Sequence, residues 1–479
     1  MDMPIIEALQ KHKKNNPTSL HVPGHKNGRI FHPALAADFE NILPYDLTEL
    51  EGLDDLQAPT GIIMQAQQKA AQLYKAQETF FLVGGTTVGN LAMVYSLFEP
   101  GDIILIQRNS HKSIFNAVQV AGVTPVLLSP EFDRETGIPI GLALETIIEA
   151  LEKYPDAKGL VITYPNYFGV SLDMKTVISE AKQHGLLVLA DEAHAAHYCT
   201  SDCFPRSTLE LGADVVTQSA HKMLPALTMS SFLHISDKLN QERRHRIKEA
   251  LAIFQSSSPS YLLMASLDGA RAYIESLDDL KIKEIIEGVT RVKAELAKIK
   301  QLKVVEWDES YLLDPLKVTI RTTTKLSGFD LQKIFYRHQL YTELADDKHV
   351  LLVFGLGHHN VSNEALEQLS QELSSYEVLE ARSSKNEIIC YRKSQQINVT
   401  SREMYSLPKK RISLENAVGF IAAEAIIPYP PGIPIVVPGE EIDEAIIIEV
   451  KKLKQAGARF QTEREVVDVL VIDSEDIDE

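Results

Sequence analysis

The stretch TVISEAKQHGLLVLADEAHAAHY, residues 176–198, decides the fold. A helical pattern over 176–185 is followed at once by GLLVLAD (185–191), an apolar run with almost no polar interruption. Such a run is typical of a strand that is buried on both faces of a parallel sheet. The run ends at Asp191, and open α/β sheets bind their ligands at the carboxyl ends of their strands. The stretch therefore predicts an α/β fold with Asp191 at the ligand-binding edge.

The same alternation of short apolar runs and helical patterns extends over about residues 60–235. The other apolar runs are TFFLV (79–83), DIILIQ (102–107), TPVLLS (124–129), GLVITYP (159–165) and ADVVTQS (213–219). Helical patterns such as 147–154 lie between them. Together they predict a mostly parallel central sheet with helices on both of its faces.

The flanking segments differ in composition and predict further domains. We expect an N-terminal arm or linker over 1–59, a large domain over 60–300, a smaller α+β domain over 301–385 and a C-terminal segment over 386–479. The last segment contains PYPPGIPIVVPGE (428–440), in which the prolines exclude a helix and favour an extended chain. The first 16 residues predict an amphipathic helix, because their apolar stretch is too short for a signal peptide.

Composition narrows the class of protein. The chain has 479 residues and a net charge of −18, which argues against a nucleic acid or an anionic membrane as partner. No apolar run is long enough to span a membrane. The cysteines are Cys199, Cys203 and Cys390, too few for a disulfide framework, and they indicate a reducing, cytoplasmic setting. Cys199 and Cys203 alone are a weak signal for zinc, and no metal site is predicted.

Two motifs predict anion and ring binding. In FFLVGGTTVGN (80–90), a strand ends in a Gly-Gly turn with two threonines before a helix, where backbone N–H groups and hydroxyls favour a phosphate. The alternative is an ordinary turn with threonine caps. In NSHKS (109–113), His111 follows a strand, although it could equally be a surface histidine.

Two further motifs supply a carboxylate and an amine. In DEAHAAHY (191–198), Asp191 and His194 follow a buried strand; a helix cap with a surface histidine is one alternative, and a metal site that includes His197 is another, although the spacing is not H-E-x-x-H. In TQSAHKMLPALT (217–228), Lys222 sits between a strand and an apolar turn. Partial desolvation lowers the pKa of a lysine, and lysines that form Schiff bases are activated in this way.

These features share one explanation. A phosphate cradle, an aromatic ring, a carboxylate and a lysine at strand ends are the groups that pyridoxal 5′-phosphate requires, because it has a phosphate, a flat ring, a pyridine nitrogen and an aldehyde.

The motifs also carry a resemblance. LHVPGHKNGR (20–29), RNSHKS (108–113), DEAHAAHY, SAHK (219–222) and PYPPGIPIVVPGE resemble the short-form bacterial Orn/Lys/Arg decarboxylases, which are fold-type I pyridoxal-phosphate enzymes with an aspartate aminotransferase-like large domain. The resemblance runs nearly end to end. It implies a cytoplasmic homodimer or higher homo-oligomer that removes the α-carboxyl group of arginine, lysine or ornithine as CO2 and leaves an amine of polyamine biosynthesis. Arginine is favoured, because short-form relatives make agmatine.

The resemblance also implies roles for individual residues. Lys222 would hold the cofactor as a Schiff base, Asp191 would pair with its ring nitrogen, and either Lys222 or His221 would return the proton to Cα. The residues that would contact the ring or the phosphate are His111, His194, Thr86, Thr87 and Ser219, together with Ser257 and Ser258 from the neighbouring subunit. The carboxylates that could face the cation of the substrate are Asp46, Glu49, Glu51, Asp54 and Asp55.

Two departures from the family pattern leave the substrate open. Ala195 replaces the glycine of DEAHGAH, and Gly419 is followed by Phe420 where the family has arginine. Two other functions stay open: a pyridoxal-phosphate-binding protein without decarboxylase activity, and another fold-type I reaction such as aminotransfer.

Overall fold

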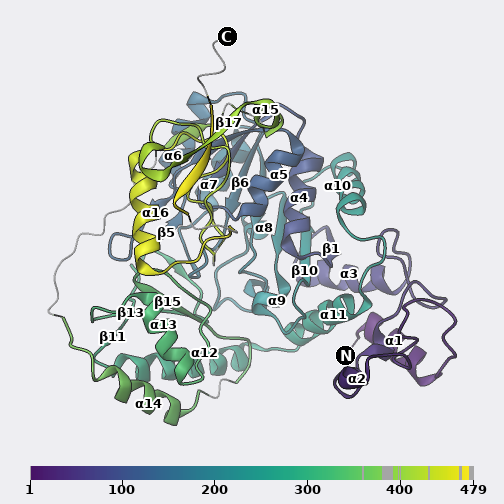
Figure 1. The fold of residues 1–479 in the computed structure, drawn as a ribbon. Helices are drawn as coiled ribbons and strands as arrows, with labels where there is room; N and C mark the ends of the chain where they lie inside the picture. Colours follow the sequence, from purple (N-terminus) through teal and green to yellow (C-terminus); the bar gives the residue numbers. More distant parts are fainter. Residues whose placement is uncertain are drawn as a thin grey trace. The chain divides into compact units, whose positions relative to one another are not determined.

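The structure is a computed structural model that describes residues 2–358, 361–379, 392–397, 399, 401–429, 432–462 and 466–473. Cys390, Pro430, Pro431 and most of the acidic C-terminal run lie outside the described residues. The chain forms two compact units, each built from separate stretches of sequence. Unit 1 comprises Met1–Leu97 and Leu189–Asp279, and unit 2 comprises Phe98–Val188 and Leu280–Glu479. Figure 1 labels their helices and strands.

Unit 1 contains four sheet strands in the order β1-β10-β9-β8. Its strands are β1 (Glu78–Leu82), β8 (Leu187–Asp191, which begins two residues before the boundary), β9 (Val215–Gln218) and β10 (Ser231–Ile235). Its helices are α1 (Pro4–Lys14), α2 (Pro33–Phe39), η1 (Leu43–Tyr45), α3 (Ile62–Leu73), α4 (Gly85–Leu97), η2 (Tyr198–Thr200), α8 (Thr208–Leu211), α9 (Ala220–Met223), α10 (Gln241–Phe254) and α11 (Tyr261–Glu275). Strands β8 and β9 are parallel, and β10 is antiparallel to both β9 and β1.

Helix α4 lies close to the sheet of unit 1, and a glycine makes this approach possible. A Cβ atom on Gly89 would lie 2.6 Å from Cγ2 of Thr217 on β9 and 2.8 Å from Cδ1 of Leu82 on β1. Because real Cβ atoms do not come so close to other side chains, only glycine fits here. The first turn of α4 is thereby held beside the carboxyl end of β9.

Unit 2 contains a second run of sheet strands, β6-β2-β3-β16, and a separate sheet, β11-β13-β15-β14. The strands are β2 (Ile103–Gln107), β3 (Thr124–Leu128), β4 (Glu131–Phe132), β5 (Pro139–Gly141), β6 (Gly159–Thr163), β7 (Val170–Ser171), β11 (Leu302–Val304), β12 (Leu312–Leu313), β13 (Lys317–Thr322), β14 (Leu344–Ala345), β15 (His349–Val353), β16 (Ser394–Gln396), β17 (Lys409–Ser413) and β18 (Asp468–Ile472). The helices are α5 (Lys112–Ala121), α6 (Leu144–Lys153), α7 (Lys175–Gln183), α12 (Asp279–Ala297), α13 (Gly328–Arg337), α14 (Asn363–Leu373), α15 (Ser401–Ser406), η3 (Leu414–Asn416) and α16 (Glu444–Ala456).

The pairing within unit 2 follows the α/β prediction. Strand β2 is parallel to both β3 and β6, and only the short β16 joins β3 in antiparallel orientation. The C-terminal part has a core of its own, in which α16 packs with the β17–β18 pair around Val436, Val450 and Val471.

All six predicted strands are present, and the α/β class is confirmed. The predicted opening helix is α1, which buries Ile5 and Leu9. Strand β10 has no counterpart among the predicted strands. Its sequence, SFLHI, mixes polar and apolar residues over only five positions, although the strand is buried along its whole length.

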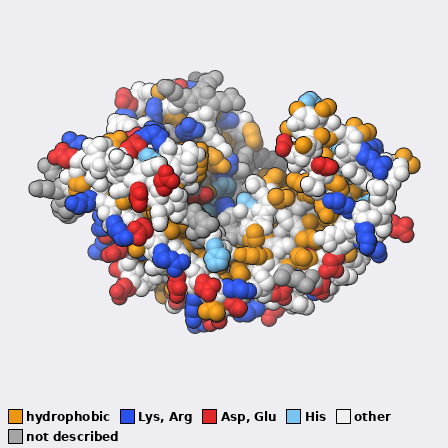
Figure 2. Space-filling view, turned by 90° about the horizontal axis from the view of Figure 1, so that it is seen from below, with side chains coloured by type: hydrophobic (Ala, Val, Ile, Leu, Met, Phe, Trp, Pro, Cys, Tyr) orange, Lys and Arg blue, Asp and Glu red, His pale blue; other side chains and the backbone are white. Residues whose placement is uncertain are grey.

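The surface carries charges of both signs. On the face drawn in Figure 2, Lys and Arg side chains are interspersed with Asp and Glu side chains rather than gathered in one patch. Among the helices in the described part of the chain, none is both long enough and apolar enough to cross a membrane.

Candidate active site

Lys222 and His194 meet at the carboxyl ends of two neighbouring parallel strands. Lys222 lies in the short helix α9, directly after β9, and His194 lies in the turn after β8. The Nζ atom of Lys222 is 3.1 Å from the Nε2 atom of His194. His194 is buried and Lys222 is half-buried, so the amine lies at the boundary of the core.

Asp191 is the last residue of β8 and only 3% of its surface is exposed. Its Oδ2 atom accepts a hydrogen bond of 2.9 Å from Nδ2 of Asn90, and its Oδ1 atom accepts one of 3.1 Å from the backbone N–H of Ala193. Asn90 is itself fixed, because its Oδ1 atom accepts a bond of 2.8 Å from the hydroxyl of Thr217. The Asp191 carboxylate is therefore buried and held in one orientation.

Three buried hydroxyl groups gather next to the first turn of α4. Thr86 is hydrogen-bonded to Ser219, and its hydroxyl lies 3.2 Å from that of Ser231 on β10. Ser219 is the residue before α9, so this hydroxyl cluster is three residues from Lys222 along the chain. Thr87, the other predicted phosphate ligand, is exposed in the same turn. Hydroxyls beside a helix N-terminus form a suitable environment for a phosphate.

His221 precedes Lys222 and has a defined tautomer. Its Nδ1 atom lies 3.0 Å from the carbonyl oxygen of Ser230, which can only accept, so Nδ1 carries the proton. Burial lowers the pKa of His221 below its ordinary value of 6.5; the bond to Ser230 opposes this shift, and the charge of Lys222 adds to it. At neutral pH, His221 is therefore uncharged, with a lone pair on Nε2.

These residues fit pyridoxal phosphate. Unit 1 offers an amine at Lys222, a buried and oriented carboxylate at Asp191 and a hydroxyl cluster at a helix N-terminus. These groups match the aldehyde, the ring nitrogen and the phosphate in chemical type. The alternative of a metal at Asp191, His194 and His197 finds no support, since the described residues contain no group of three His, Cys, Asp or Glu side chains arranged to hold one.

His111 lies in unit 2, four residues after the end of β2, where it caps the N-terminus of α5. Its Nδ1 atom accepts the backbone N–H of Ser113 at 3.2 Å and lies 2.8 Å from the Ser113 hydroxyl. The imidazole is thus held from one side by the helix that it caps.

The predicted substrate carboxylates differ in their surroundings. Asp54 is buried, and its two oxygens accept the backbone N–H groups of residues at the start of α3. Asp46 lies 3.2 Å from His25. Glu49, Glu51 and Asp55 are exposed. Asp54 therefore serves to cap helix α3, whereas the other four carboxylates do not bind the start of a helix in this way.

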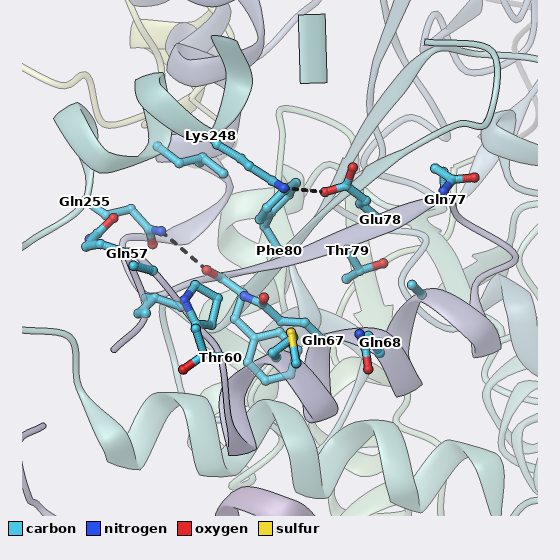
Figure 3. Close-up of a pocket in the computed structure, with 17 residues that line it drawn as sticks. Gln57, Thr60, Gln67, Gln68, Gln77, Glu78, Thr79, Phe80, Lys248 and Gln255 are labelled. Carbon is cyan, nitrogen blue, oxygen red and sulfur yellow. Dashed lines mark hydrogen bonds and ion pairs between the residues drawn. The ribbon is translucent and has the colours of Figure 1, made fainter. Parts of the chain in front are cut away.

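A cavity of about 650 Å³ in unit 1 lies beside the edge strand β1 (Figure 3). The side-chain amide of Gln255 occupies the open edge of β1: it accepts the N–H of Val83 at 2.9 Å and lies 3.4 Å from the carbonyl oxygen of Phe81. Lys248 and Glu78 form an ion pair of 2.9 Å in the same cavity. None of the predicted cofactor ligands is among the residues described in the lining. Gln255 directly precedes three consecutive serines, residues 256–258, and so fixes the start of the segment that carries Ser257 and Ser258. Both of these serines are exposed.

Sequence reasoning missed several residues of this arrangement. Asn90 ends the motif FFLVGGTTVGN, and its position four residues after Thr86 places both on one face of a helix, which is a usable signal. The sequence contained no comparable signal for Ser231, because the strand that carries this residue was not predicted. Glu192, next to Asp191, is fully buried and accepts hydrogen bonds from Ser207, Thr208 and Gln218.

The fold has solved counterparts. The chain superposes on the crystal structure of the Francisella novicida lysine decarboxylase LdcF with a TM-score of 0.83 and 20% sequence identity, covering 98% of this chain and 81% of that one. A Sphingomonas wittichii serine palmitoyltransferase matches with a TM-score of 0.53 at 14% identity, covering 78% of this chain and 83% of that one. The fold is that of the fold-type I pyridoxal-phosphate enzymes.

Sequence comparison defines the family. The family model described as Orn/Lys/Arg decarboxylase, major domain, matches residues 3–307, and the one for the C-terminal domain matches residues 390–461. The uncharacterised protein YaaO of Bacillus subtilis is 43% identical over 95% of this chain and 94% of its own length, and the arginine decarboxylase of the same organism is 35% identical over 96% and 95%. The chain belongs to the Orn/Lys/Arg decarboxylase family, a family of pyridoxal-phosphate-dependent amino-acid decarboxylases. The resemblance read from the sequence is thereby confirmed.

Proposed function

We propose that this enzyme removes the α-carboxyl group of a basic amino acid, with Lys222 as the residue that holds the cofactor covalently. The observation that carries the proposal is the contact of Lys222 with His194 beside Asp191, which Asn90 holds in place. An amine and an oriented carboxylate match two of the groups of the cofactor, and they occur here at the ends of adjacent parallel strands.

Pyridoxal phosphate, when bound, supplies a carbonyl group that condenses with amines and a ring that takes up the electrons of the broken bond between Cα and the carboxylate. Asp191 would keep the ring nitrogen protonated through a charge-assisted hydrogen bond. Thr86, Ser219 and Ser231 would donate hydroxyl hydrogen bonds to the phosphate, and Thr87 would add a donor from the helix terminus.

Proton transfer falls to the pair His221 and Lys222. Lys222 would return the proton to Cα. His221 would act as a proton acceptor rather than as the donor, because its proton resides on Nδ1 and its Nε2 atom carries a lone pair at neutral pH. His194 would orient the Lys222 amine while it is not bound to the cofactor. His111 is proposed as the residue that stacks on the ring, on the basis of the family resemblance.

Arginine is the first substrate to test, since a relative named arginine decarboxylase matches nearly the whole chain. Lysine and ornithine follow. Asp46, Glu49, Glu51 and Asp55 are the proposed partners of the substrate cation, and Asp54 is the least favoured because α3 already uses both of its oxygens. The amine product would enter polyamine biosynthesis in the cytoplasm.

We also propose a homodimer. The N-terminal arm exposes several large apolar side chains, and Leu20 is 91% exposed. The others are Val22, Ile30, Leu35, Phe39 and Ile42. Exposed apolar groups concentrated on one segment favour burial against another chain. Ser257 and Ser258 are exposed as well, as expected of residues that reach the phosphate of a neighbouring subunit.

The test is product analysis with carboxyl-labelled arginine, lysine and ornithine. Release of labelled CO2 with the matching amine supports the proposal and identifies the substrate. A keto acid without CO2 would indicate aminotransfer instead. Cofactor binding without turnover of any of the three would favour a binding protein.

A further inference from the structure

We propose that Gly432 is a positioning residue for His111: the C-terminal segment, through Gly432, sets the orientation of the His111 imidazole. This inference rests on the role of His111 in the proposed function, and it gives the C-terminal segment a task in the active site. Both residues belong to unit 2.

Gly432 leaves little room for a side chain beside the imidazole. A Cβ atom on Gly432 would lie 3.2 Å from Nε2 and 3.3 Å from Cδ2 of His111, and 3.5 Å from the ring of Tyr429 on the other side. The φ angle of Gly432 is +86°, a left-handed conformation that disfavours any side chain. The conformation therefore favours glycine, and a Cβ atom at this position would crowd the imidazole.

Backbone hydrogen bonds fix the glycine. Its N–H donates to the carbonyl oxygen of Pro428 at 3.1 Å, and its carbonyl oxygen accepts the N–H of Lys112 at 3.1 Å. Lys112 is the residue after His111. Gly432 is thus bonded to the backbone next to the histidine that it positions.

The imidazole is held between two structures. Ser113 binds its Nδ1 edge, and Gly432 lies on the side of its Nε2 edge, where a Cβ atom would come too close. The ring cannot rotate without losing the bond to Ser113, and a side chain at position 432 would press on it. The orientation of its face is thereby set by contacts from α5 and from the C-terminal segment.

A buried ion pair secures this segment to the same strand end. Arg108, three residues before His111, binds Glu440 through two hydrogen bonds of 3.2 and 2.9 Å. Its guanidinium also donates to the carbonyl oxygen of Pro434 at 2.9 Å and to that of Ile435. The two side chains are 4% and 2% exposed. Buried, bidentate pairs of this kind specify one arrangement of the segments that they join.

The test compares Gly432→Ala with Gly419→Ala. Gly419 lies in the same C-terminal part with the same φ of +86°, but a Cβ atom there would meet no atom within 4 Å. The two variants share the backbone strain, and only the first meets the imidazole. In the full-length protein freed of cofactor, the rate of His111 modification by diethyl pyrocarbonate is measured by mass spectrometry relative to the exposed His245. The dissociation constant of pyridoxal phosphate is measured in parallel by absorbance.

We expect Gly432→Ala to change the His111 labelling rate several-fold and to weaken cofactor binding by about tenfold, while Gly419→Ala leaves both unchanged. Ser113→Ala removes the hydroxyl at the other edge of the ring without backbone strain, and it should change the His111 labelling rate in the same way. This variant replaces Gly432→Ala in the test if Gly432→Ala does not fold. Equal labelling of His111 in the Gly432 and Gly419 variants would overturn the inference. Should the wild type bind no pyridoxal phosphate, the proposed function fails, and the labelling comparison still decides whether Gly432 positions His111.

Discussion

The Nε2 atom of His194 lies 3.1 Å from the Nζ atom of Lys222. When Lys222 is an ammonium group it can only donate, so Nε2 then accepts, and the ring proton of a neutral His194 then resides on Nδ1. His194 therefore determines where the amine of Lys222 rests, and it does so from the turn that follows Asp191.

Replacing His194 separates ring contact from hydrogen bonding. His194→Phe retains a flat ring but cannot accept from Lys222, whereas His194→Ala loses both. We expect both variants to lower kcat by about 10–100-fold, because a misplaced reactive group slows the reaction, and only the alanine variant to weaken cofactor binding as well. Titration with pyridoxal phosphate and steady-state kinetics measure the two effects. Wild-type kcat in the phenylalanine variant would contradict a role for the hydrogen bond.

Asn90 should strengthen cofactor binding by holding the Asp191 carboxylate in place. In Asn90→Ala, Oδ2 of Asp191 loses its side-chain donor, and a lost bond to a charged group costs about 1.5–3 kcal/mol, or roughly 10–100-fold in cofactor affinity. Asn90→Asp should be at least as harmful, since it places a second carboxylate beside the first. Thr217→Val is the matched comparison. It removes the bond that holds Asn90 but leaves Asn90 present, so it should weaken cofactor binding less than Asn90→Ala does. Cofactor affinity at the wild-type level in Asn90→Ala would remove Asn90 from the site.

Asp54 is expected to act on stability rather than on substrate binding. Asp54→Asn retains one acceptor oxygen where two are used at the start of α3, so unfolding should become easier by about 1–2 kcal/mol. KM for the basic amino acid should not change. Urea unfolding and kinetics check this, with Asp55→Asn as the exposed neighbour for comparison. A raised KM at unchanged stability would restore Asp54 as a substrate ligand.

The buried His234 should make the folded state less stable as the pH falls. It is fully buried between Thr79 and Gln218, and burial lowers its pKa from 6.5 to about 3. Because the unfolded chain binds this proton more tightly, the stabilising contribution is complete above pH 6.5 and declines as the pH falls toward 3. The decline is about 1.4 kcal/mol for each pH unit.

His234→Gln should therefore flatten the pH dependence of the urea midpoint between pH 6.5 and 4. This holds however much the substitution lowers the stability at pH 8. The exposed His245→Gln should leave the slope unchanged. A slope in His234→Gln as steep as that of the wild type would show that other groups cause the acid sensitivity.

The sequence predicts the strands and the strand-end residues because both are encoded locally. GLLVLAD is apolar without interruption, and Asp191 is simply the next polar residue. Lys222 likewise follows soon after a strand, four residues beyond the end of ADVVTQ. The α4 turn was recognisable from its glycines, one of which, Gly89, permits the close approach of the helix to the sheet.

What local patterns do not predict are contacts between distant segments. Asn90 reaches Asp191 across 101 residues, and nothing in either motif specifies the pair. His111 was singled out within its motif and Gly432 lies within the motif PYPPGIPIVVPGE, but their proximity depends on how the C-terminal part folds within unit 2. Strand β10 was missed because its burial comes from its neighbours β1 and β9 rather than from an apolar sequence.

The most direct test of the central claim is to trap the cofactor on Lys222. The purified protein is incubated with pyridoxal phosphate, reduced with borohydride and digested, and the modified peptide is located by mass spectrometry, with Lys222→Arg as a control that retains the charge. The account predicts one pyridoxyl group on Lys222 in the wild type, and in the variant neither this group nor CO2 release from a basic amino acid. A pyridoxyl group on another lysine, or turnover by Lys222→Arg at the wild-type rate, would contradict it.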